Sequence, residues 1–205
     1  MDRQQRWHLD YGKERTLMDL MIDIETLATN PDAVVLTIGA IKFDPFADNR
    51  DSVDFENKEI NMDVFYRRID PESFTWPEAT IDNGTLEWWA RQADDVKEEA
   101  FAEDGRVSIQ DAMLDFRRWV GEVDSVWANG PAFDIVILES HAKHIKRAVP
   151  WKYYQVKDTR TVYGLVEHER PGHALHHAAW DCWSQIVALQ SCFRNLNITK
   201  YPSRR

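Results

Sequence analysis

The sequence predicts an α/β fold in which one mixed five-stranded sheet is flanked by helices on both faces. Two observations predict this class of fold. Apolar segments rich in β-branched residues occupy the first third of the chain, and helical and strand-like patterns alternate beyond them. The chain has 205 residues, which suits one domain with a substantial hydrophobic core.

The first strands are expected as an antiparallel meander. Residues 20–25 and 33–43 are apolar and β-branched, with the turn signal Asn30-Pro31 between them. Residues 44–57 are polar, and we expect a loop there. Residues 60–69 alternate well enough to predict a third strand.

Beyond residue 70 the apolar period becomes mainly helical. In chain order we expect a short helix capped by Thr85, a helix capped by Ser108, a strand over 125–128, a helix over 133–145, a last strand over 153–156, a short helix over 159–166 and a long amphipathic helix over 178–196. This order suits a ribonuclease H-like fold. The expected domain spans 18–198, after an N-terminal arm or extension over 1–17 and before a tail over 199–205.

Composition limits the kind of protein. The net charge of −10 argues against a wide, non-specific grip on long nucleic acid, although bound divalent metals can supply local positive charge. Clustered acids at 44–54 and 94–104 are expected to be solvated. No apolar run is long enough to span a bilayer, so we expect no membrane association. Cys182 and Cys192 lie about 15 Å apart on one expected helix, too far for a disulfide, so the predicted location is cytoplasmic.

Two carboxylates share a face of the first strand. Side chains alternate along a strand, so Asp23 and Glu25 point to one face while Ile22 and Ile24 point to the other. Like charges on a central strand must be paired, hydrogen-bonded or metal-bound. Taken alone, the pair is also compatible with an exposed strand end.

A third carboxylate and a histidine–aspartate pair follow. Asp134 stands where a helix is expected to begin after the turn at Asn129-Gly130, and the helix dipole favours an acid there even without a function. His176 and Asp181 converge if His176 lies on the approach to the last helix and Asp181 one turn inside it. A histidine is the side chain best suited to accept a proton near neutral pH.

Together these pieces resemble the DEDDh 3′–5′ exonuclease family. Its three motifs appear in order as Asp23-Ile24-Glu25-Thr26, Phe133-Asp134 and the run from His176 to Asp181. The chain is most similar to the branch of phage DexA-like exonucleases and the mycobacterial adenylate-specific ribonuclease. That branch carries the patterns seen here at 85–92 (Thr-Leu-Glu-Trp-Trp-Ala-Arg-Gln) and at 158–161 (Asp-Thr-Arg-Thr).

The resemblance implies a metal-dependent mechanism. Asp23, Glu25 and Asp181 would hold one Mg²⁺ or Mn²⁺ ion, Asp23 would share a second, and Asp134 would act directly or through a water. His176 would be the general base, because Ala178 and Asp181 then fall where the motif has its alanine and aspartate. The neighbouring His173 and His177 are expected to be exposed or supporting residues. No cysteine–histidine cluster has zinc spacing, and no glycine-rich phosphate loop occurs.

Substrate contacts are expected close to these groups. Thr26 and Leu27 follow the first motif, and Arg160 belongs to the pattern at 158–161. Trp88 or Trp89 is expected to stack on a base, since neighbours on a helix cannot both face inward; otherwise one is core and the other a surface or dimer residue. The expected partners are 3′ ends of single-stranded DNA or RNA, with a slight preference for DNA. Relatives that pair imply a homodimer.

Two other functions remain open from the sequence. One is a nucleic-acid-binding module that kept the fold but not the chemistry, which the presence of all five candidate catalytic residues disfavours. The other is a metal-dependent hydrolase of small phosphoesters or very short oligonucleotides, which the acidic charge favours. A 3′–5′ exoribonuclease is the alternative within the exonuclease class.

Overall fold

The computed structural model describes residues 18–172 and 176–202. The expected N-terminal arm over 1–17, the end of the tail over 203–205 and His173 lie outside the described residues. Within the described ranges, no helix is long and apolar enough to cross a membrane.

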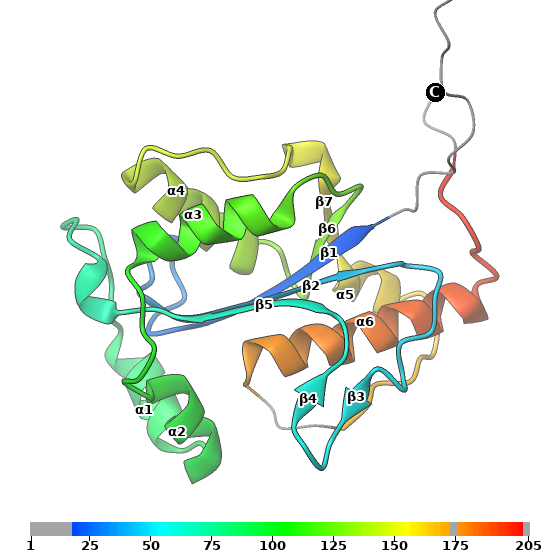
Figure 1. Cartoon of the computed structure of the whole chain (residues 1–205), viewed down its shortest axis with the longest axis horizontal. Helices are drawn as coiled ribbons and strands as arrows, with labels where there is room; N and C mark the ends of the chain where they lie inside the picture. The colour runs from blue at the N-terminus through cyan, green and yellow to red at the C-terminus, as the bar shows by residue number, and fades with distance from the viewer. Residues whose placement is uncertain (1–17, 173–175, 203–205) are drawn as a thin grey trace, which may run out of the picture.

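The main sheet has five strands in the order β5-β2-β1-β6-β7 and confirms the predicted mixed sheet (Figure 1). Strands β1, β2 and β5 form the expected antiparallel meander, and β6 and β7 add to β1 in parallel. The bounds are β1 Asp19–Thr26, β2 Val35–Phe43, β5 Asp63–Arg68, β6 Val126–Ala128 and β7 Val156–Asp158.

Helices cover both faces of this sheet, as predicted. Figure 1 shows α3 and α4 over one face and α6 beneath the other, with α1 and α2 grouped beyond one end of the sheet. The bounds are α1 Asn83–Ala90, α2 Asp94–Phe101, α3 Ile109–Val120, α4 Asp134–His144, α5 Thr159–Tyr163 and α6 Ala178–Asn195, with short 3₁₀ helices η1 Pro71–Ser73 and η2 Tyr153–Gln155.

The two faces of β1 pack into two separate cores. Leu20, Ile22 and Ile24 belong to the core beneath α3 and α4, whereas Met21 belongs to the core around α6. Because side chains alternate along a strand, Asp23 and Glu25 lie on the same face as Met21. The sheet therefore presents both acids towards α6, on the face that the sequence predicts they share.

Helix α6 is buried all round, so the prediction of an amphipathic helix is wrong. Every residue from Ala178 to Phe193 is buried. The side of α6 away from the sheet is covered by a hairpin, β3 (Val53–Asp54) with β4 (Glu59–Ile60), which lies within and beyond the expected polar loop. The Phe55 ring of this hairpin stacks on Trp180, with ring centroids 5.6 Å apart.

Two local predictions are also corrected. The side chain of Asp82, rather than Thr85, caps α1: it accepts a hydrogen bond from the Thr85 backbone N–H at 2.8 Å. An aspartate accepts such a bond as readily as a threonine, and here it precedes the first turn. The last strand begins at Val156, because residues 153–155 form η2; Gln155 fixes this turn by donating to the Val123 carbonyl.

Candidate active site

Three carboxylates meet at one end of the sheet. Asp23 and Glu25 come from the end of β1, and Asp181 comes from the first turn of α6. One oxygen from each lies within 4.8 Å of the other two. Glu25 and Asp181 are buried, whereas Asp23 keeps some contact with solvent. The Gln185 side-chain amide donates to Asp23 at 2.8 Å and orients that carboxylate.

Asp134 joins this group from the opposite face of the sheet. It is the first residue of α4, is buried, and accepts a hydrogen bond from the Ile24 backbone N–H at 3.1 Å. Strand β6 pairs with β1 only at Leu20 and Met21, which leaves the Ile24 N–H to a side chain. The short length of β6 thus brings Asp134 beside the end of β1.

These acids repel one another strongly. Burial first, and then the charges of the neighbouring acids, raise the pKa of Asp23 and of Glu25 well above the usual range. Burial raises the pKa of Asp134 to about 7, against the stabilising hydrogen bond from Ile24. A cluster with this many acids and only oxygen donors fits a hard divalent cation, which would favour the ionised carboxylates.

His176 is held at the start of α6 in an unusual backbone conformation. Its φ of 61° lies in the left-handed region, two residues before the helix begins. Its ring packs edge-on against Trp88, with centroids 4.7 Å apart, and more distantly against Trp89 at 6.4 Å. The structure therefore places His176 on the approach to α6, where the sequence predicts it, with its ring directed towards α1.

A close backbone approach fixes where α6 begins. A Cβ added at Gly39 on β2 would lie 2.4 Å from the carbonyl carbon of Ala178. Only glycine allows the first turn of α6 to rest on the sheet at this distance. That contact sets the positions of His176 and Asp181 relative to β1, and sequence reasoning did not identify it.

His177 is part of a half-buried polar cluster. Its ring stacks on Tyr66, with centroids 4.7 Å apart, and its Nε2 lies 3.7 Å from Glu99. Glu99 also accepts hydrogen bonds from the Tyr66 hydroxyl at 2.7 Å and from Arg68 at 2.8 Å. Burial lowers the pKa of His177. Glu99 belongs to the acidic segment that the sequence predicts to be solvated; its side chain is 27% exposed and is paired within this cluster.

A cavity of about 390 Å³ opens beside the carboxylates. It is lined by Glu25 and Thr26 from β1, by Trp88 and Trp89 from α1, and by Phe133 just before α4, among others. Trp89 is buried and its indole N–H donates to the Thr26 carbonyl at 2.8 Å, so it is a core residue. Trp88 is half-buried and its ring is the one available to a ligand.

The other expected substrate contacts differ in their exposure. The Thr26 hydroxyl donates to the Ala28 carbonyl at 2.6 Å, and Leu27 is a core residue whose N–H donates to Val34. Arg160 is exposed, and its guanidinium lies against Gly130 in the turn that leads to Asp134. The charge of Arg160 lowers the pKa of Asp134, although burial outweighs it.

Comparison with known proteins agrees with this geometry. Residues 18–192 match the family described as the 3′–5′ exoribonuclease Rv2179c-like domain. The chain belongs to this family. As an Rv2179c-like protein with DEDDh motifs, it is a 3′–5′ exonuclease.

Other known proteins resemble the chain in sequence or in fold. An exodeoxyribonuclease of Enterobacteria phage T4 is 22% identical over 212 residues, covering 87% of this chain and 90% of the phage protein. The fold is shared with E. coli exonuclease I, solved as a complex with single-stranded DNA, at a TM-score of 0.62 and 14% identity. This Rv2179c-like chain covers only 42% of exonuclease I and is itself covered to 89%. The nuclease domain of 3′hExo, a DEDDh family member bound to rAMP, is 9% identical with a TM-score of 0.55, covering 93% of this chain and 98% of that domain.

Proposed function

We propose that this protein removes nucleotides one at a time from the 3′ end of single-stranded nucleic acid and releases 5′-mononucleotides. The observation that carries the proposal is the three-carboxylate cluster beside a cavity large enough for a nucleoside. The single Trp88 ring at the cavity wall offers a face or edge to the terminal base.

The chain's own residues divide the work. Asp23, Glu25 and Asp181 would hold the cation, with Asp134 acting beside them. In this proposal two divalent ions, Mg²⁺ or Mn²⁺, supply the positive charge that offsets the carboxylates and the reacting phosphate. His176 takes the proton from the attacking water, and its left-handed backbone and its packing on Trp88 hold the imidazole in place for that transfer.

DNA is the proposed polymer, with RNA as the alternative. The phage relative named as an exodeoxyribonuclease supports DNA, whereas the name of the family supports RNA. The Thr26 hydroxyl donates its proton to the Ala28 carbonyl, so towards a ribose 2′-OH it can act only as an acceptor. A homodimer, expected from the resemblance, belongs to the same proposal, as does a cytoplasmic location, which rests on two free, buried cysteines.

The test is digestion of matched, 5′-labelled single strands of DNA and RNA of about 24 nucleotides, and of a blunt duplex, with Mg²⁺ or Mn²⁺. A ladder that shortens from the 3′ end, with single strands cut far better than the duplex, is expected. A tenfold higher kcat/KM on RNA, about 1.4 kcal/mol of transition-state binding, would reverse the preference for DNA. Cleavage of dinucleotides alone would establish the short-oligonucleotide hydrolase, and no cleavage would leave a binding module. Light scattering at micromolar concentration decides the dimer, because a monomer has a mass of 24.0 kDa.

A further inference from the structure

One segment of this acidic chain is positively charged. Between Lys143 and Lys157 there are five lysines and arginines and no acid, while the whole chain has a net charge of −10. None of the five cations pairs with an acid among the residues that the structure describes. Unpaired cations of one sign on a protein of the other sign point to an anionic partner.

The last part of this stretch lies along the edge of the sheet. Strand β7 is an outermost strand and runs parallel to β6, so its end at Asp158 lies towards the candidate active site. Just past that end, the exposed Arg160 lies against the Gly130 turn before Asp134. The edge therefore begins beside the carboxylate cluster.

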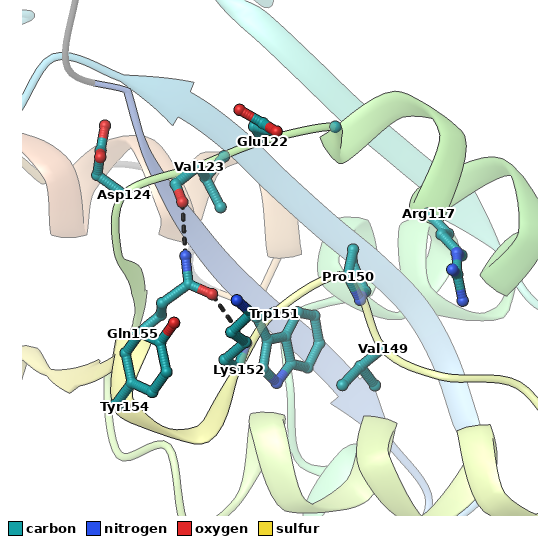
Figure 2. Close-up of a pocket in the computed structure, with 11 residues that line it drawn as sticks. Arg117, Glu122, Val123, Asp124, Val149, Pro150, Trp151, Lys152, Tyr154 and Gln155 are labelled. Atoms are coloured by element: carbon teal, nitrogen blue, oxygen red, sulfur yellow. Dashed lines mark hydrogen bonds between the residues drawn. The ribbon is translucent and has the colours of Figure 1, made fainter.

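The other end of this edge opens into a second cavity. Before β7, the Tyr153 side chain is 87% exposed and Tyr154 is 47% exposed. Figure 2 shows Lys152, Tyr154 and Gln155 on one side of a cavity of about 520 Å³, with Arg117 facing it from α3. Lys157 lies between the two ends and its ammonium group is 3.4 Å from the Tyr154 carbonyl.

We propose that this row, the β7 track (Lys152, Tyr153, Tyr154, Lys157 and Arg160), binds the 5′-ward part of the single strand whose 3′ end is in the candidate active site. Cations that follow a phosphate backbone, interleaved with exposed rings on which bases stack, are how proteins hold single strands without reading their sequence. The inference rests on the proposed exonuclease function and adds a second contact region to it.

The length of the track predicts how much nucleic acid it holds. From Arg160 back to Lys152 the chain makes a three-residue strand and a three-residue 3₁₀ turn. At about 3.3 Å and 2.0 Å per residue, this spans roughly 15–20 Å. About five stacked nucleotides at roughly 3.4 Å each cover that length. Strands much shorter than this do not reach the tyrosines.

Two negative side chains also line the far cavity, so the strand is expected to follow the cations along β7 rather than to enter that cavity. Glu122 and Asp124 come from the loop before β6, and Figure 2 shows Asp124 on the same side of the cavity as Gln155, with Glu122 between that side and Arg117. An acidic protein segment is the other occupant that the cations would suit. The continuity of the row with the active-site end of the sheet favours the strand, because a docked protein has no need of that direction.

The test compares matched single strands of about 2 and about 24 nucleotides with the same 3′ end, using the full chain and Mg²⁺. For the Lys152→Glu/Lys157→Glu variant, we expect KM on the long strand to rise at least tenfold with kcat unchanged, and both constants on the short strand to stay the same. Tyr153→Ala should raise KM on the long strand about fivefold or more. Lys58→Glu, on the β3–β4 hairpin, is a single charge-reversal control outside the track, and it should change KM for neither strand.

A binding measurement without catalysis provides the second readout. Fluorescence anisotropy of the labelled long strand in EDTA should show weaker binding by the double variant. Its log Kd against log salt should have a slope lower by about 1.4, since each lost phosphate contact on a single strand removes about 0.7. The Lys58→Glu control should keep the wild-type slope.

The outcomes separate this inference from the proposed function. If the wild type cuts both strands with equal KM, or if the double variant loses the short strand as much as the long one, the β7 track is wrong while the exonuclease stands. If the double variant binds and cuts the long strand normally, the cations serve another partner and the inference is also overturned. If the wild type cuts neither strand, the proposed function itself fails.

Discussion

The carboxylates at the end of β1 favour binding of a cation, but their mutual repulsion destabilises the protein when no cation is bound. Asp23→Asn or Asp181→Asn is expected to abolish hydrolysis, because each keeps the side-chain volume but removes a charged oxygen donor from the cluster. The same change relieves the repulsion that raises the pKa of Asp23 and Glu25. We therefore expect the Tm of either variant in EDTA to equal or exceed that of the wild type.

Nuclease assays and thermal unfolding in EDTA check this pair of effects together. A chain of this size loses about 2–4 °C in Tm for each 1 kcal/mol of stability. A fall of more than about 4 °C in metal-free Asp23→Asn would show that the carboxylate stabilises the fold, contrary to the proposed role.

The two adjacent histidines should differ in what they do. His176→Ala is expected to lower kcat by roughly 10²–10⁴-fold with little change in KM or in metal affinity, because it removes the general base. His177→Ala should reduce kcat much less, since His177 faces Tyr66 and Glu99 rather than the cavity, and acts only by holding the loop. Steady-state kinetics on one single strand and calorimetric metal titration give both rankings. If kcat falls more for His177→Ala than for His176→Ala, His177 rather than His176 is the general base.

At the scale of elements, the start of α6 is the part on which the site depends most. Gly39 lets the helix backbone touch β2, and a methyl group there would lie 2.4 Å from Ala178. Because two backbone segments would have to separate, Gly39→Ala is expected to cost at least 1–3 kcal/mol, about 2–12 °C in Tm. It should also reduce kcat, since His176 and Asp181 move with the helix.

Gly164→Ala is the control for that substitution. Its added Cβ would meet its nearest neighbour, the Arg160 carbonyl oxygen, at 3.6 Å, an ordinary contact, so Tm and kcat should stay close to those of the wild type. If Gly39→Ala behaves like Gly164→Ala in thermal unfolding and in turnover, the close approach of α6 to β2 does not control the site.

For the molecule as a whole, the features that depend on neighbouring residues in the sequence could be predicted, and those that depend on contacts between distant segments could not. Strand alternation and helix periodicity are local, so they placed Asp23, Glu25, Asp134 and Asp181 on the right elements. The contact of α6 with Gly39 and the cluster around His177 join segments far apart in sequence, and no local pattern announces them.

The polar residues of α6 and the net charge of the chain also gave an incomplete picture of burial and local charge. Helix α6 contains polar residues that suggest a solvated face, but other segments bury them: Gln190 bonds to Asp44 and Asn49, and Ser184 and Ser191 bond to residues 169–171. The net charge of −10 argues against a wide, non-specific binding surface, but that one number does not show that five cations fall between 143 and 157 with no acid among them. Burial and local charge depend on the neighbours that the fold supplies, which composition does not record.

Asp19, a buried acid outside the candidate active site, links the stability of the whole protein to pH. Asp19, at the start of β1, is fully buried and accepts hydrogen bonds from the Trp127 indole at 2.7 Å and from the Tyr201 hydroxyl. Burial outweighs these bonds and raises its pKa to about 6, whereas an aspartate in an unfolded chain titrates near 3.9. The folded state therefore holds the proton more tightly than the unfolded state does.

This stabilisation is fully present below about pH 3.9 and is lost as the pH rises through about 6. The difference in pKa corresponds to roughly 3 kcal/mol at most. Asp19→Asn carries no ionisable proton, so its free energy of unfolding should fall less between pH 4 and pH 8 than that of the wild type. Denaturant unfolding of both proteins in EDTA measures the two slopes. The carboxylates of the active site contribute the same fall to both, so parallel curves would show that Asp19 ionises in the fold as it does in the unfolded chain.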